Sequence, residues 1–154
     1  MNISFYVLSE SKAQDFLGFI CQLTQTALNK STQSVLILVE DEALLSALDE
    51  ALWAQEATSF IPHQRLLATD SADTSVTHQV LAPVLLASYL PADFKGIVIN
   101  TASHPINRFI AATNNAQPTR VLELIKPDTN SVDEGRHKYK TYQQAGYQLT
   151  HFKV

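Results

Sequence analysis

Cysteine and glycine are both scarce in this chain of 154 residues, which holds one cysteine and four glycines. The single thiol, Cys21, excludes an internal disulfide and a zinc site built from several cysteines, and it fits a reducing, cytoplasmic setting. Nucleotide-binding loops need glycines clustered at a strand-to-helix turn, so that backbone N–H groups reach phosphate. Here the glycines are scattered, and Glu10 puts a carboxylate in the first such turn. We therefore expect no nucleotide cofactor.

Metal-binding patterns, catalytic motifs and long apolar runs are also missing from the sequence. The five histidines form no pair four residues apart and no HExxH motif, so no metal site is predicted. No GxSxG nucleophile turn is present, and Cys21 has no basic neighbour that would activate it, which favours a buried structural thiol. No apolar stretch approaches the ~20 residues of a membrane span. The residues after Met1 lack the basic segment of a signal peptide, so we expect a cytoplasmic protein without membrane contact.

The charge of the chain is acidic overall but unevenly distributed. There are 15 acidic and 11 basic residues, which give a formal net charge of −4. A protein that binds duplex DNA normally has a basic field, so we expect no strong direct DNA binding. From residue 126 onward, however, five basic residues accompany three acidic ones. This basic C-terminal region on an acidic body favours a local anionic partner, such as a peptide.

Hydrophobic periodicity predicts an α/β fold. Hydrophobic residues make up 45% of the chain and charged residues 17%, which is typical of a globular protein, and residues 1–154 are predicted to form one domain. Strands are predicted at 3–8, 34–39, 84–89, 97–100, 121–125 and 147–154, and helices at 9–30, 41–54, 106–112 and 129–145, with a loop at 65–79. This order predicts a three-layer, Rossmann-like sandwich with a mostly parallel central sheet.

Trp53 is the first candidate binding residue. The second predicted helix buries an apolar arc, and at ~100° per residue Trp53 falls roughly 130° from its centre. Phe60, Ile61 and Pro62 follow shortly after. A Trp and a Phe near a helix end are typical anchors of a protein interface. Alternatively, Trp53 packs over the end of the hydrophobic core, with Phe60 beneath it.

The last predicted helix supplies the second candidate site. Arg136, Tyr139, Lys140 and Gln143 follow i, i+3, i+4, i+7 spacing and share one face. A planar guanidinium suits bidentate capture of a carboxylate, the ammonium adds a point charge, and the phenol offers an apolar wall. These residues would hold an acidic peptide end. A solvated basic face near a helix C-terminus is the alternative.

Several segments together resemble a known family. They are SFYVL at 4–8, VEDEALLSALDEALWAQEATSFIPH at 39–63 and RHKYKTYQQAGYQL at 136–149. These segments are similar to the chi subunit of bacterial DNA polymerase III, whose members carry a DEALW helix end followed by SF-[VI]-PH. The matches cover roughly half of the chain, in the family's order, and residues 64–118 add nothing to them.

The resemblance implies a non-catalytic accessory subunit of the clamp-loader assembly. It would bridge the psi subunit and the acidic, Phe-ended C-terminal tail of single-stranded DNA-binding protein (SSB). The family contacts psi, or a helicase that competes for the same surface, at the positions of Trp53, Phe60 and Pro62. A small cytoplasmic α/β enzyme, a hydrolase or a nucleotide-handling protein, is the alternative function.

The resemblance also assigns the tail-binding residues. The family grips the SSB tail at the positions of Arg136, Tyr139 and Lys140, with Ile125 lining the pocket. One further basic position of the family is Val132 here. That departure predicts a weaker contact with the tail, or a replacement of the missing cation by Lys126 or Lys138.

Overall fold

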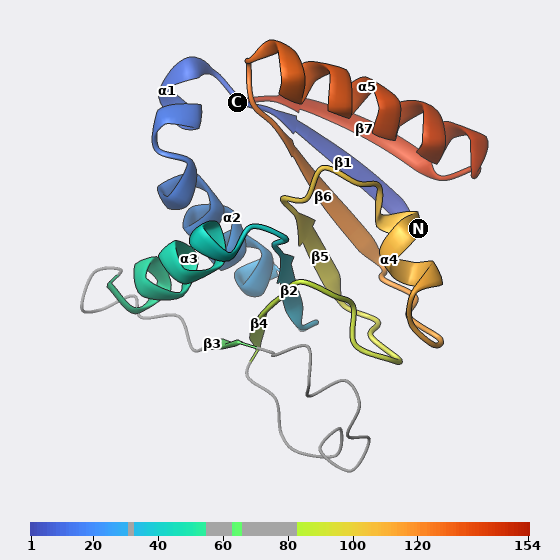
Figure 1. The fold of residues 1–154 in the computed structure, drawn as a ribbon, viewed down its shortest axis with the longest axis horizontal. Helices are drawn as coiled ribbons and strands as arrows, with labels where there is room; N and C mark the ends of the chain where they lie inside the picture. The colour runs from blue at the N-terminus through green and yellow to red at the C-terminus, as the bar shows by residue number, and fades with distance from the viewer. Residues whose placement is uncertain (31–32, 55–62, 66–82) are drawn as a thin grey trace.

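The protein forms a single parallel sheet between two layers of helices. The structure is a computed structural model that describes residues 1–30, 33–54, 63–65 and 83–154 (Figure 1). The described elements, in chain order, are β1 (Asn2–Val7), α1 (Glu10–Gln14), α2 (Phe16–Lys30), β2 (Val35–Leu38), α3 (Glu42–Ala54), β3 (His63–Arg65), β4 (Val84–Ala87), β5 (Ile97–Asn100), α4 (Ile106–Ala111), β6 (Arg120–Ile125), α5 (Thr129–Gln144) and β7 (Gln148–Lys153). The seven described strands lie in the order β3-β4-β2-β5-β6-β1-β7. All their pairings are parallel, which confirms the predicted α/β, Rossmann-like fold.

Each face of the sheet carries its own apolar core. In β2, Val35 and Ile37 join a cluster with residues of α2 and α3, whereas Leu36 and Leu38 join a cluster with residues of α4 and α5. Every residue of β2 is buried. An unbroken apolar run therefore forms a central strand covered on both sides, as the sequence predicts.

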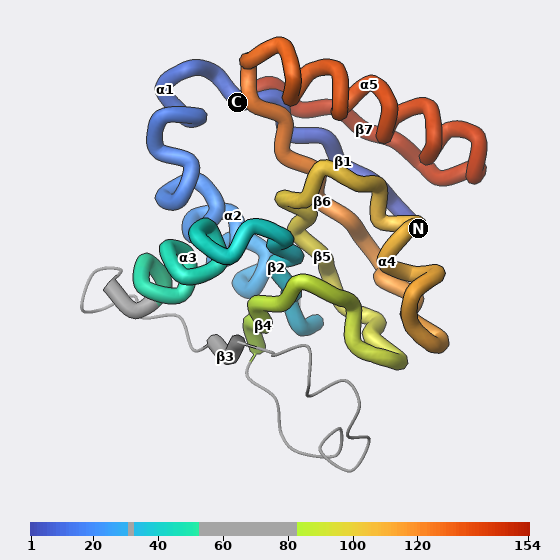
Figure 2. The backbone as a smooth tube through the Cα atoms, in the orientation of Figure 1, coloured from blue at the N-terminus to red at the C-terminus, as the bar shows by residue number. Residues whose placement is uncertain are grey.

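One edge region of the sheet is formed by β6, β1 and β7. β1 lies between the other two strands, and α5 lies along β7 (Figure 2). Side chains alternate along a strand, so Phe5 belongs to the core on the α5 side while Tyr6 packs against the core on the α2 side. In the register of the sheet, Phe5 is aligned with His151 and Tyr6 with Phe152.

The first helical region is interrupted, which the sequence does not predict. A single helix over 9–30 is expected, but α1 ends at Gln14 and α2 begins at Phe16. Between them Asp15 leaves helical geometry, with φ −107° and ψ 53°. Its carboxylate lies where a Cβ atom at Gly18 would be, so Gly18 makes room for the side chain that sits at the break.

Three helix ends agree with the predicted ranges 41–54 and 129–145, and the structure shows what caps each of them. Asp41 Oδ1 accepts a hydrogen bond from the Ala43 N–H at 3.0 Å, which caps α3. Gly146, with φ 81°, follows the end of α5 in the left-handed conformation that favours glycine. At the start of α5, Asp128 accepts hydrogen bonds from the backbone and the hydroxyl of Ser131, and these hold the pKa of Asp128 below its usual range. This cap therefore contributes at neutral pH and is lost as the pH falls through that lowered pKa.

Two further predictions concern burial and membranes. Cys21 is 1% exposed, so the interpretation as a buried thiol is confirmed. Among the helices of the described ranges, none combines the length and the apolar character that crossing a bilayer requires.

Candidate peptide-binding site

A groove lies between α5 and the strands beneath it, and it contains the residues predicted to bind an acidic tail. Its volume is about 400 Å³. It is lined by Phe5, Val7, Ile125, Val132, Gly135, Arg136, Tyr139, Lys140 and His151. The set includes all four predicted tail-binding residues, although Ile125 comes from β6 and the other three from α5. The structure thus brings them together in one cavity.

One wall of the groove is a stack of rings. His151 lies parallel to Phe5, with ring centroids 5.2 Å apart and an interplanar angle of 15°. Tyr139 closes the group, with its centroid 5.9 Å from that of Phe5 and 5.3 Å from that of His151. Such packing fixes the phenol ring without strain, because aromatic pairs are favourable at centroid separations of about 4.5–7 Å. Phe5 and His151 are site residues that the sequence analysis does not identify.

The rim of the groove is cationic and open to solvent. Arg136 and Lys140 lie one turn apart on α5, and both are exposed. The Arg136 side chain is 76% exposed, and its ion pair with Asp133 spans 3.8 Å between two exposed groups. A pair of this kind contributes little, so the guanidinium is able to receive another carboxylate. Val132, where the resemblance predicts a basic residue, also lines the groove and adds apolar surface there.

Gly135 determines how closely α5 approaches β6 under the groove. A Cβ atom at this position would lie 2.6 Å from Ile125 Cδ1 and 3.1 Å from Ile125 Cγ1. Real Cβ atoms do not make contacts of 2.6 Å, so a side chain at 135 would have to displace Ile125. The glycine therefore keeps the floor of the groove open.

Gly135→Ala is accordingly expected to reduce both stability and tail binding. Alanine gains about 0.5–1 kcal/mol of helix propensity over glycine, but overpacking a buried contact costs about 1–3 kcal/mol. The net loss should be about 1 kcal/mol in the free energy of unfolding, measured by urea denaturation. Binding of a tail peptide should weaken as well, because the displaced Ile125 enters the groove. Unchanged binding by a fully folded variant would show that the ligand does not reach this floor.

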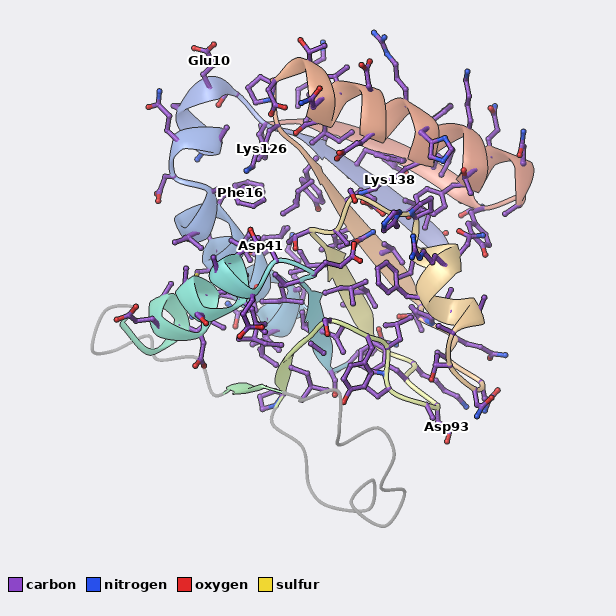
Figure 3. All side chains as sticks on the ribbon, in the orientation of Figure 1. Glu10, Phe16, Asp41, Asp93, Lys126 and Lys138 are labelled. Atoms are coloured by element: carbon purple, nitrogen blue, oxygen red, sulfur yellow. The ribbon has the colours of Figure 1, made fainter. Side chains whose placement is uncertain are left out.

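Lys138 does not contribute to the groove, contrary to one prediction. Its side chain points from α5 toward the sheet, as Figure 3 shows, and the residue is 5% exposed. Its Nζ donates to Glu123 Oε1 at 2.9 Å and to the Ala102 carbonyl at 2.5 Å. Lys126 is also engaged elsewhere, since its Nζ lies 4.2 Å from the centroid of the Phe16 ring. Neither lysine is among the residues that line the groove, so the replacement of the missing cation by Lys126 stays a prediction.

The carboxylate of Glu123 organises a buried hydrogen-bond network below α5. Besides Lys138, it accepts hydrogen bonds from Asn100 Nδ2 at 2.8 Å and from the hydroxyl of Tyr142. The Tyr142 oxygen in turn accepts from the N–H of Ile106 at 2.8 Å. Burial, followed by the nearby Glu123 charge, raises the pKa of Tyr142 far above its usual value, so the phenol stays protonated and donates. The network ties α5 to β5, β6 and α4, and so fixes the helix whose outer face forms the rim.

The second predicted interface lies at the end of α3. Trp53 belongs to the last turn of that helix, but its side chain is not among the described parts of the structure. Phe60 and Pro62 lie outside the described residues. The interface formed by these three residues stays a prediction.

The part of the chain that the structure describes contains no candidate metal site. There, no three side chains of His, Cys, Asp or Glu are placed to share an ion. The groove itself offers cations and rings, which suit an anionic organic ligand.

Comparisons with known proteins give a consistent result. The family described as DNA polymerase III chi subunit, HolC, matches residues 1–150. The chain is 30% identical over 151 residues to DNA polymerase III subunit chi of Escherichia coli K12, covering 96% of this chain and 95% of that protein. It is 28% identical over 150 residues to the Pseudomonas aeruginosa subunit of the same name, covering 96% and 92%.

Solved structures with low sequence identity share the fold. A chain in the structure of Saccharomyces cerevisiae Dbp5 bound to Nup159 and Gle1 superimposes with a TM-score of 0.62 at 13% identity, over 98% of this chain and 41% of that one. Domain 2 of the DEAD-box helicase Mss116p gives a TM-score of 0.62 at 11% identity, over 100% of this chain and 65% of that one. The chain thus spans less than two thirds of both structures, and at such identities the likeness concerns the fold alone.

Proposed function

The chain belongs to the DNA polymerase III chi subunit family, and from that premise we propose that it is a non-catalytic accessory subunit of the bacterial replicative polymerase. In this role it links the psi subunit of the clamp-loader assembly to the C-terminal tail of SSB, and so couples the polymerase to SSB-coated template. The observation that carries the proposal is the groove in which Arg136 and Lys140 border a wall of aromatic rings.

The groove matches the chemistry of a tail that ends in phenylalanine after acidic residues. In the proposed complex the terminal carboxylate lies at Arg136 and Lys140, where a guanidinium and an ammonium both donate. The last ring of the tail packs against Tyr139 and Ile125. The preceding acidic residues lie near the basic face of α5. Because charge supplies much of this attraction, the affinity should fall as the salt concentration rises.

The arrangement of layers supports a bridging role. α3 packs on one face of the sheet and α5 on the other. A psi subunit bound at the end of α3, through Trp53, Phe60 and Pro62, would therefore leave the groove at α5 accessible to the SSB tail. A helicase that uses the same α3 surface would compete with psi but not with the tail.

The test is fluorescence anisotropy of a labelled acidic tail peptide titrated with the purified chain. Three peptides should be compared: the tail with its terminal Phe, the tail without that residue, and the tail with an amidated C-terminus. We expect binding only of the first, with a dissociation constant that rises with salt between low and physiological ionic strength.

The second and third peptides serve as matched controls for the ring and the carboxylate. Equal binding of all three would mean that only the acidic residues are recognised, which contradicts the proposed groove complex. An absence of binding for the first peptide at low salt would contradict the SSB-tail function itself.

A further inference from the structure

A second groove lies on the opposite face of the same edge strands, next to α2. Its volume is about 380 Å³. It is lined by Tyr6, Leu23, Thr26, Ala27, Lys30, Gln33, Ile97, Arg120, Leu122 and Phe152. The alternation of side chains explains its position: Phe5 and His151 form the wall of the first groove, while their neighbours Tyr6 and Phe152 line the second.

Two stacked rings form the exposed end of this second groove. The rings of Tyr6 and Phe152 have centroids 5.2 Å apart and an interplanar angle of 23°. Phe19 supports Tyr6 from the side at 6.3 Å in an edge contact. Phe152 is 40% exposed, and it is one of two large hydrophobic side chains that are exposed in the described residues. A ring held flat from below and open to solvent is suited to stacking against a planar ligand.

The same groove carries two cations and no carboxylate. The guanidinium of Arg120 is held across the sheet by Ser4 Oγ, which accepts from Nη2 at 3.0 Å and from Nε at 3.3 Å. This anchoring orients the guanidinium, and within the described residues no hydrogen bond occupies Nη1, which could therefore receive a ligand. Lys30 enters from the last turn of α2. In a chain with more acidic than basic residues, a groove lined by cations without acids selects an anionic ligand.

We propose that this second groove binds single-stranded DNA through a contact of one or two nucleotides. A base packs on the exposed ring of Phe152, and a phosphate of the same DNA strand lies between Lys30 and Arg120. Stacking rings beside a basic groove are the general means by which proteins hold single strands without reading their sequence. The acidic body of the chain limits the contact to a short segment and to a modest affinity, in agreement with the expected lack of strong DNA binding.

The proposal does not depend on the SSB-tail function, because the two grooves lie on opposite faces of β1 and β7. One edge of the sheet would nonetheless serve both ligands. A chain that holds the SSB tail on the α5 side would present its second groove to single-stranded DNA on the α2 side.

The experiment is a fluorescence anisotropy titration of a labelled oligothymidylate of about 12 nucleotides at low salt. Phe152→Ala should weaken binding about fivefold, because a stacked base is lost. Lys30→Ala should weaken binding and also reduce the slope of log K against log salt, by about 0.7, the value for one phosphate contact on a single strand.

The controls separate this groove from nonspecific attraction and from the tail site. Lys95→Ala removes an exposed cation outside both grooves and should leave DNA binding unchanged. Arg136→Ala should likewise retain DNA binding. The tail peptide, titrated against the same proteins, should bind Phe152→Ala as it binds the parent chain.

Three results would overturn the proposal. The first is an absence of oligonucleotide binding by the parent chain at low salt. The second is equal loss in Lys95→Ala and Lys30→Ala, which indicates nonspecific charge. The third is unchanged DNA binding by a folded Phe152→Ala variant, with circular dichroism as the check on folding. If Phe152→Ala loses binding of the tail peptide but keeps binding of DNA, the second groove binds a peptide instead.

Discussion

Lys138→Met is expected to lower the free energy of unfolding by about 3–5 kcal/mol, the loss that is typical when one partner of a buried ion pair is removed. Glu123 is fully buried, and in this variant its carboxylate would keep only the hydrogen bonds from Asn100 and Tyr142. The Ala102 carbonyl would also lose its donor. Methionine fills a similar volume, so the effect measures the charge and not a cavity. Urea denaturation followed by circular dichroism gives the value.

Two controls make this prediction specific. Lys140→Met changes the same residue type on the same helix at an exposed position, and it should alter stability by no more than about 0.5 kcal/mol. The double variant Glu123→Gln/Lys138→Met removes both charges while glutamine still accepts a hydrogen bond. It should recover part of the loss seen in Lys138→Met, since no unpaired charge remains. A double variant that is less stable than Lys138→Met would show that the pair is not coupled in this way.

Arg136→Ala should weaken binding of the Phe-ended tail peptide about tenfold while leaving the fold intact. Charge-assisted hydrogen bonds contribute about 1.5–3 kcal/mol, and the exposure of this side chain places its contribution near the lower limit. Nothing buried depends on Arg136, because its one ion pair in the described residues is an exposed contact with Asp133. Anisotropy with the tail peptide measures the affinity, and the midpoint of urea denaturation should stay unchanged.

Arg136→Lys distinguishes geometry from charge at the same position. Lysine keeps the positive charge but loses the planar fork that pairs with a carboxylate, so its affinity should lie between those of Arg136→Ala and the parent chain. Lys95→Ala serves as the control for net charge. If Arg136→Ala binds the peptide as tightly as the parent chain does, the carboxylate of the tail does not lie at this rim.

Much of the fold follows from local patterns in the sequence. The unbroken run at 34–39 is a central strand because apolar residues on both of its faces need cover from two helical layers. Polar signals mark the caps of α3 and α5. The break at Asp15 was not predicted from these patterns, because no proline or glycine interrupts residues 9–17 and the break depends on how the Asp15 carboxylate fits against Gly18.

The groove was predictable only in part. Arg136, Tyr139 and Lys140 share a helix face, so their spacing indicates a common site, whereas Ile125 was assigned through the family resemblance. His151 and Phe5 lie far apart in the chain, and their contact depends on the pairing of β1 with β7. The alignment of β1 with β7 cannot be predicted from a local sequence pattern.

The buried ion pair was hidden for a different reason. The inner stripe of α5 consists of Gly135, Lys138 and Tyr142, at i, i+3 and i+7. The spacing is that of a core-facing stripe, but a lysine at its centre makes the helix look polar throughout. The available signal was Lys138 itself, a polar residue at a position where the helical period predicts an apolar one.

The place of β1 between β6 and β7 has a consequence for the order of folding. Asn2 pairs with both Arg120 and Gln148, so the first strand of the chain finds its two neighbours only in the last third of the sequence. Contacts between such distant segments must close long loops, which slows folding relative to local pairing. During synthesis, β1 leaves the ribosome long before either partner strand exists. The groove under α5 uses residues from all three strands, so it cannot form before His151 of β7 has been synthesised.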